Sequence, residues 1–160
     1  MNRRGVALTK VQLEQFLADV SECQPEYASF FLFLSSVPFF ASELLALSVE
    51  DITNPDGTLR KTLCINGVVF LLSDWQQWYL SGLLRETSGC VFRLTDGSKL
   101  SMERLRKFLY RYNQSHATHM TLTSFRRYYL MSQLSTKQKD VTELCSEVHM
   151  RPGRLYQYLA

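Results

Sequence analysis

The fold is decided by two segments, Thr121-Leu-Thr-Ser-Phe-Arg-Arg-Tyr-Tyr129 and Glu147-Val-His-Met-Arg-Pro-Gly-Arg-Leu-Tyr-Gln-Tyr158. The first predicts a helix that Thr121 or Thr123 caps, with Arg126 and Arg127 in its first turn. Cationic side chains are unfavourable there, because the N-terminal end of a helix carries partial positive charge. An anion bound nearby would offset that cost, so we expect Thr123, Ser124 and the helix N-terminus to form an anion pocket with Arg126.

The second segment predicts the end of one helix and a short helix after it. Asp140 and Glu143 have the spacing of a capping box, with Asp in place of Ser or Thr. His149 follows the apolar face of that helix, and a loop then leads into a short helix that carries Arg154 and Tyr158. Two plainer interpretations stay open: His149 as a surface or core-edge histidine, and Tyr158 as a terminal aromatic that pins the last helix.

Residues 101–113 predict an amphipathic helix with a basic stripe. Its inward face holds Leu105, Phe108, Leu109 and Tyr112. Another face carries three cations at i, i+3 and i+7, namely Arg104, Lys107 and Arg111. Such a stripe can follow a phosphate backbone, because each neutralised phosphate releases counterions. An ordinary solvated face would look the same.

The charge distribution also bears on whether the chain binds a polyanion. The net charge is +3, yet residues 99–160 hold 11 Lys and Arg against 4 Asp and Glu, whereas residues 1–98 hold 7 against 11. The C-terminal part is therefore a candidate surface for a polyanion.

The N-terminal part predicts helices followed by a small sheet. A helix over residues 10–21 would bury Val11, Phe16 and Val20, and Pro25 begins a second helix. A third helix carries one apolar stripe of Phe40, Leu44 and Leu47.

The dipeptide Asn66-Gly67, between the strand-like residues 58–65 and the apolar run 68–72, indicates a tight hairpin. We expect it in a three-stranded antiparallel sheet. Ser73 or Asp74 then caps a helix whose apolar face holds Trp75, Trp78, Tyr79 and Leu83. The predicted fold class is mainly α with a small three-stranded antiparallel sheet (α+β), in a single domain over residues 1–160.

Several classes of protein are disfavoured. The most apolar run, residues 30–40, is shorter than the ~20 residues of a membrane-spanning helix, and the N-terminus has no secretory h-region. The cysteines are far apart, without a Cys-x-x-Cys pair, which gives neither a zinc site nor a disulfide framework: Cys23, Cys64, Cys90 and Cys145. We expect a protein of the reducing cytosol with no metal.

Four segments, in order, give the chain a family resemblance. Residues 39–47 (Phe-Phe-Ala-Ser-Glu-Leu-Leu-Ala-Leu), followed by Val49-Glu-Asp-Ile52, resemble the Gly-Leu-Arg-Ile-Ser-Glu-Leu-x-x-Leu box of tyrosine recombinases and its trailing Asp-Ile. Residues 121–127 are similar to the Thr-Pro-His-x-Leu-Arg-Arg box of that family. Glu147-Val-His149 falls where the family has Leu-Gly-His, and Tyr158 lies at the spacing of the nucleophile. The resemblance covers nearly the whole chain and implies the catalytic-domain fold of phage-integrase-type enzymes.

The resemblance also implies a chemistry and shows where it is incomplete. In that family a tyrosine attacks a DNA phosphodiester to form a 3′-phosphotyrosyl link without any cofactor, while arginines, histidines and a hairpin lysine serve the phosphate and the leaving oxygen. Arg126, His149 and Tyr158 match the second arginine, the later histidine and the nucleophile. The first arginine's position holds Phe40, the first histidine's position holds Thr123, and the hairpin tip has no lysine: Asn66-Gly67. Arg60 and Lys61 are the nearest basic residues, near the start of the preceding strand.

These residues lead to the functional expectation. We expect a bacterial cytosolic or nucleoid protein that binds double-stranded DNA on a basic concave face, has lost most catalytic residues, and serves a plasmid or other mobile genetic element as an accessory or regulatory factor. A protein partner could supply the missing function, and no small-molecule cofactor or membrane is involved. The expected phosphate contacts are Arg104, Lys107, Arg111, Arg126, Arg127 and Arg154.

Two alternatives stay open. One is an active or partner-activated recombinase that uses Tyr158. The other is a protein-interaction module that no longer binds DNA. We also expect no separate N-terminal core-binding domain and no helix after Tyr158 to dock into a neighbouring protomer.

Overall fold

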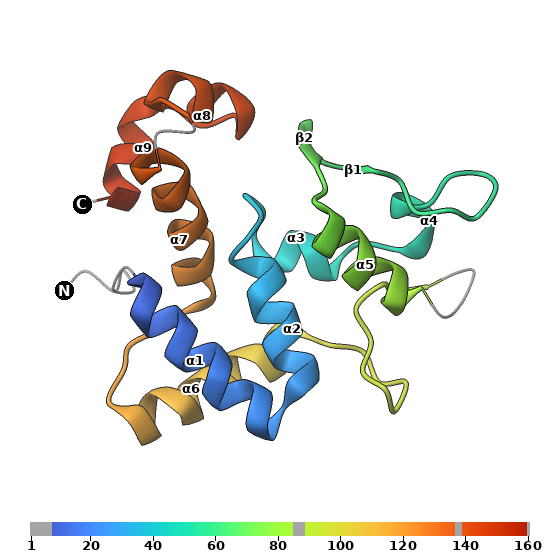
Figure 1. The fold of residues 1–160 in the computed structure, drawn as a ribbon, viewed down its shortest axis with the longest axis horizontal. Helices are drawn as coiled ribbons and strands as arrows, with labels where there is room; N and C mark the ends of the chain where they lie inside the picture. Colours follow the sequence, from blue (N-terminus) through green and yellow to red (C-terminus); the bar gives the residue numbers. More distant parts are fainter. Residues whose placement is uncertain (1–7, 85–88, 137–138, 160) are drawn as a thin grey trace. The chain divides into compact units, whose positions relative to one another are not determined.

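The computed structural model describes residues 8–84, 89–136 and 139–159, the last three by their backbone alone, and is mainly helical (Figure 1). The chain divides into two compact units, Met1–Phe40 with Arg106–Ala160, and Ala41–Leu105. The prediction of a single domain over residues 1–160 stays a prediction. In chain order the helices and strands are α1 (Lys10–Cys23), α2 (Pro25–Leu34), α3 (Ala41–Leu45), α4 (Val49–Ile52), β1 (Thr62–Ile65), β2 (Val68–Leu71), α5 (Asp74–Leu83), α6 (Met102–His116), α7 (Leu122–Ser135), α8 (Val141–Glu147) and α9 (Pro152–Leu159).

Helix α1 begins where its capping box predicts. The backbone N–H of Gln12 donates to Thr9 Oγ1 (3.1 Å), and that of Thr9 donates to Gln12 Oε1 (3.0 Å). The buried face differs in one residue from the prediction, because Val11 is 74% exposed. Leu13 takes its place, since residues 13, 16 and 20 share one stripe of a helix with 3.6 residues per turn, and residue 11 lies on the opposite side.

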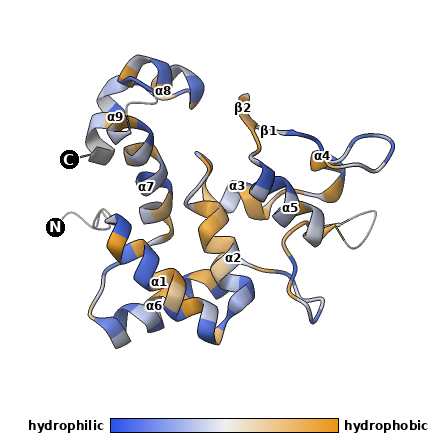
Figure 2. Ribbon diagram, viewed as in Figure 1, coloured by the Kyte–Doolittle hydropathy of each residue, from blue (hydrophilic) through white to orange (hydrophobic). Residues whose placement is uncertain are grey.

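The core of the first unit is built from aromatic rings. Figure 2 shows α2 as a largely hydrophobic helix, and its Phe30, Phe31 and Phe33 are buried. The Phe31 ring stacks on Phe125 of α7, with centroids 4.9 Å apart, and meets Phe16 of α1 edge to face at 5.0 Å. These contacts join α1, α2 and α7 and fix where the first turn of α7 lies.

The last three helices pack on one another at one end of α7 (Figure 1). Asp140 caps α8 by accepting from the N–H of Glu143 at 2.8 Å, as predicted. Tyr129 of α7 is buried here, and burial, with a smaller effect from the charge of Glu147, raises its pKa to about 12. Lys139 pairs with Glu147 across α8.

The second unit contains the predicted hairpin but a smaller sheet than predicted. β1 and β2 pair antiparallel around Asn66 and Gly67, which have φ of 51° and 80°. Within the described residues the sheet has two strands, so the prediction of three is wrong. The segment before β1 makes only an isolated bridge, Thr53 with Leu59, because a serine-capped helix, α4, occupies the residues up to Ile52.

The apolar face of α5 is also rotated relative to the prediction. Ser73 caps this helix as expected, and Trp75 stacks on Tyr79 with ring centroids 5.5 Å apart. Leu80 and Gln76, one turn apart, form the buried side, whereas Trp78 is 73% exposed. The prediction that Trp78 belongs to the core is therefore wrong, since residue 78 lies about 200° around the helix from either of them.

The described residues contain neither a membrane-spanning helix nor a cluster of metal ligands. None of the described helices is long and apolar enough to cross a membrane. Among those same residues, no three His, Cys, Asp or Glu side chains gather as a metal site.

Candidate functional site

Arg126 is the central residue of the candidate site, and its guanidinium is held by neighbours within the first unit. It lies in α7, is 5% exposed, and donates from Nε to the backbone carbonyl of Pro38 at 2.7 Å. Its Cζ lies 4.1 Å from the centroid of the Phe40 ring. A hydrogen bond and a cation–π contact therefore tie α7 to the segment that follows α2.

The partner in that cation–π contact is the residue at the position where tyrosine recombinases have their first arginine. Phe40 offers Arg126 a ring face, and a ring donates no hydrogen bond to a phosphate. Two guanidinium groups side by side would repel each other unless an anion lay between them. With phenylalanine here, the guanidinium of Arg126 lies against an aromatic ring and not beside a second cation.

Other groups at the start of α7 are also buried or half-buried. The Ser124 hydroxyl accepts a hydrogen bond from the Thr121 backbone N–H at 3.0 Å and is buried. Arg127 is 6% exposed, and Thr123 is half-buried. The predicted anion pocket of Thr123, Ser124 and Arg126 stays a prediction, as does direct phosphate contact by the two arginines.

His149, just after α8, and Arg154, on α9, are exposed, and both helices pack against α7. His149 has a left-handed backbone (φ 53°) directly after α8, where Met150 donates to the Cys145 carbonyl at 2.9 Å. Tyr158 lies in α9, but its side chain falls outside the described residues. The positions that match the second arginine, the later histidine and the nucleophile therefore lie in α7, directly after α8 and in α9, and these three helices touch one another.

In the second unit the hairpin tip makes a contact of its own. Asn66 Nδ2 donates to Glu43 Oε2 of α3 at 2.7 Å, which ties the tip to a carboxylate. Arg60 is occupied similarly, since its Nε donates to the Thr53 carbonyl at 3.0 Å. Lys61 is exposed before β1.

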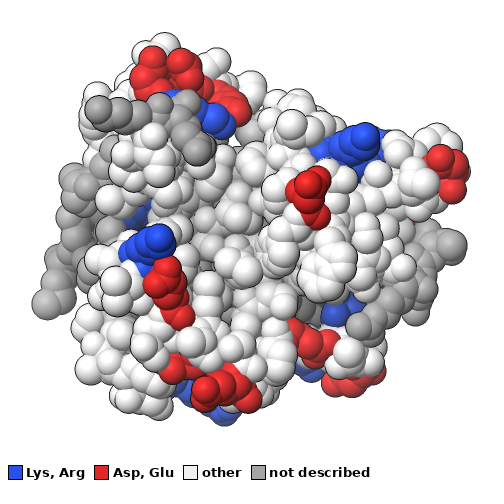
Figure 3. All heavy atoms as spheres, in the orientation of Figure 1, with Lys and Arg blue, Asp and Glu red and all other residues white. Residues whose placement is uncertain are grey.

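The basic stripe of α6 is present and accessible. Arg104, Lys107 and Arg111 are exposed, while Leu105 and Leu109 are buried, as the amphipathic pattern predicts. Arg104 also donates from Nη1 to Ser98 Oγ at 3.0 Å. On the face drawn in Figure 3, by contrast, acidic side chains gather over α8.

Sequence reasoning missed a polar cluster between α1 and α6. The Tyr112 hydroxyl donates to Asp19 Oδ2 at 2.7 Å, and His116 Nε2 lies 3.6 Å from the same oxygen. The Tyr112 hydrogen bond, more than any other group, holds the pKa of Asp19 below its usual value. Burial and the same carboxylate raise the pKa of Tyr112 above its usual value. The helical spacing of Tyr112 and His116 was the only sequence signal, because Asp19 lies far away in the chain.

Comparisons with known proteins show the fold. No protein-family model matches the chain, and no curated protein matches it. A structure of the Tn1549 transposon integrase in complex with circular intermediate DNA matches with a TM-score of 0.72 at 14% identity, over 97% of this chain and 61% of that one. The crystal structure of XerA recombinase matches with a TM-score of 0.72 at 10% identity, over 100% of this chain and 60% of that one. The chain therefore has the expected tyrosine-recombinase-like fold, and it spans about three fifths of the length of these solved structures.

Proposed function

We propose, from the tyrosine-recombinase-like fold as premise, that this protein binds double-stranded DNA without cleaving it and acts as an accessory or regulatory factor of a mobile genetic element such as a plasmid. The observation that carries the proposal is the packing of Arg126 against Phe40 and the Pro38 carbonyl. That packing turns a phosphate-binding position of the fold into a structural contact. We place the protein in the bacterial cytosol or nucleoid, with no cofactor, and with a second protein supplying any strand cleavage.

Support for DNA binding comes from the fold and from accessible cations. Structures with the same fold include the Tn1549 integrase in complex with circular intermediate DNA and with transposon right end DNA. In this chain Arg104, Lys107, Arg111 and Arg154 are exposed and can reach phosphates. Arg126 and Arg127, which are buried, would act mainly by holding α7 in place.

Support for lost cleavage comes from the donors that the site lacks. A phosphoryl transition state is stabilised by hydrogen-bond donors aimed at its oxygens, and each missing donor typically costs about 10²–10³ in rate. Phe40 and Thr123 replace an arginine and a histidine of the family, and the hairpin tip bonds a carboxylate through Asn66. Three such losses together would remove about six or more orders of magnitude if they acted independently.

Duplex binding is tested by fluorescence anisotropy of a labelled random duplex over a salt series. Each neutralised phosphate contributes about −0.9 to the slope of log K against log salt. Four exposed contacts therefore give wild type a slope of about −3 to −4. Lys107→Ala/Arg111→Ala should weaken binding and flatten the slope by about 1.8.

The matched control is Lys10→Ala/Lys99→Ala, which removes the same charge from exposed residues outside the proposed interface. It should leave the slope within about 0.5 of wild type, less than one phosphate contact. If both double variants flatten the slope equally, binding depends on net charge alone and the stripe on α6 is not the interface. If wild type shows no salt-dependent binding, the fold serves a protein partner and the proposal is wrong.

A further inference from the structure

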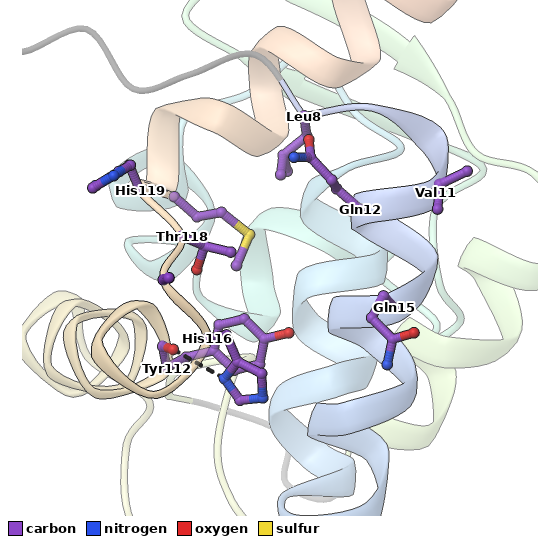
Figure 4. Close-up of a pocket in the computed structure, with 10 residues that line it drawn as sticks. Leu8, Val11, Gln12, Gln15, Tyr112, His116, Thr118 and His119 are labelled. Carbon is purple, nitrogen blue, oxygen red and sulfur yellow. Dashed lines mark hydrogen bonds between the residues drawn. The ribbon is translucent and has the colours of Figure 1, made fainter.

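A cavity of about 410 Å³ lies in the first unit. It is bounded by α1, by the last turn of α6 and by the connection that leads into α7 (Figure 4). Leu8 and Met120 are buried and form its apolar floor, whereas Gln12, Gln15 and His116 are exposed at its mouth. Its volume falls within the range of sites that bind small molecules.

The polar groups around the cavity leave a donor and an acceptor for a ligand. Gln12 uses its Oε1 in the helix cap, which leaves its Nε2 to donate. Gln15 uses its Nε2 on Asp19 Oδ1 at 2.9 Å, which leaves its Oε1 to accept. Both glutamines come from α1 and lie across the cavity from Tyr112 and His116 in Figure 4.

The charges around the cavity select against an ionic ligand. Of the described residues that line it, none is lysine, arginine, aspartate or glutamate. The nearest carboxylate, Asp19, accepts hydrogen bonds from Tyr112 and Gln15 and faces His116 Nε2 at 3.6 Å. A phosphate or a nucleotide would therefore find no lysine or arginine to offset its desolvation.

The apolar and aromatic lining favours a flat ring. Tyr112 and His116 both line the cavity, and their rings stack on each other with centroids 3.9 Å apart. Met120 adds a polarisable thioether, which packs well against aromatic edges. We infer that this cavity is a binding site for an uncharged aromatic small molecule that carries one or two hydrogen-bonding groups.

The test uses N-phenyl-1-naphthylamine, an uncharged aromatic amine whose fluorescence rises in apolar surroundings. Wild type should bind it saturably at one site, with a Kd on the order of 100 µM from the usual binding energy per non-hydrogen atom. Gln15→Trp, which places an indole at the mouth of the cavity, should weaken binding by about tenfold or more. Ala18→Trp, an exposed position of the same helix outside the cavity, is the matched control and should bind like wild type.

Two further measurements keep the result interpretable. Circular dichroism melting of both tryptophan variants checks that each is folded. In protein labelled at its methionine methyl groups, the probe should shift the Met120 signal, which Met120→Leu identifies by its loss. The inference is overturned if wild type does not bind saturably, if both tryptophan variants bind alike, if the Met120 signal does not move, or if an anionic naphthalene sulfonate binds more tightly than the uncharged amine.

Discussion

Arg126→Met tests the assignment of this arginine as a structural contact. The substitution removes the 2.7 Å hydrogen bond to the buried Pro38 carbonyl and the contact with the Phe40 ring. A buried acceptor left without its donor costs about 1–3 kcal/mol, and a desolvated cation–π contact contributes up to about 2 kcal/mol. Burying a charge opposes both, so the expected loss of unfolding free energy is about 2–4 kcal/mol. In a chain of 160 residues, this corresponds to a Tm lower by about 5–15 °C.

The assay is thermal unfolding of the two variants beside wild type, followed by circular dichroism. Arg154→Met is the matched control, because Arg154 is exposed on α9 and its loss should change the unfolding free energy by less than about 0.5 kcal/mol. An arginine that is held ready for a phosphate would instead strain the free protein, and its removal would stabilise the fold. An unchanged or raised Tm for Arg126→Met would therefore refute the structural assignment.

Three further predictions concern pH and the hairpin. Tyr112→Phe should lower Tm at pH 7 and make Tm less sensitive to acid. The Tyr112 hydrogen bond depresses the pKa of Asp19, so the stability that it contributes is present above about pH 4 and is lost as pH falls through the depressed pKa. Equal melting curves for variant and wild type in acid would count against this. The pKa of Tyr129 is raised to about 12, so the stability that its neutral form contributes is full below about pH 10 and is lost as pH rises to about 12. Tyr129→Phe should therefore flatten the fall in Tm between about pH 10 and about 12. A fall in Tm parallel to that of wild type would contradict the burial argument. Asn66→Ala loses the hydrogen bond to Glu43 and puts alanine in a left-handed backbone conformation, so it should speed amide exchange in β1 and β2. Asn66→Gly also loses the hydrogen bond but tolerates that conformation, so it should speed exchange less. Faster exchange in Asn66→Gly than in Asn66→Ala would show that backbone strain is not the cause.

Local signals in the sequence located several helix starts correctly. The capping boxes of α1 and α5, the proline that begins α2 and the aspartate that caps α8 all act within four residues, so sequence alone exposes them. The same locality led to the errors. Val11 and Trp78 are apolar residues of amphipathic helices, and only tertiary packing decides which side of each helix is buried.

The candidate site depended on contacts between residues far apart in the chain. The family resemblance identified Arg126 and Phe40 separately, but no pattern in the sequence shows that one stacks on the other. Asp19 and Tyr112 are a comparable pair, because their hydrogen bond joins residues that are 93 positions apart in the chain. The third strand was expected from local strand and turn patterns, whereas the residues up to Ile52 form the serine-capped helix α4.

The central claim, binding without cleavage, is tested most directly on one labelled nicked duplex that would trap a covalent intermediate. Each sample is divided between a native gel and a denaturing gel, with Tyr158→Phe and Lys107→Ala/Arg111→Ala beside wild type. Binding without cleavage predicts a retarded protein–DNA complex in the native gel, with a weaker band for the double variant. It also predicts no protein–DNA adduct after denaturation. A denaturation-resistant adduct that wild type forms and Tyr158→Phe does not would show an active recombinase and contradict the account, as would the absence of any native complex.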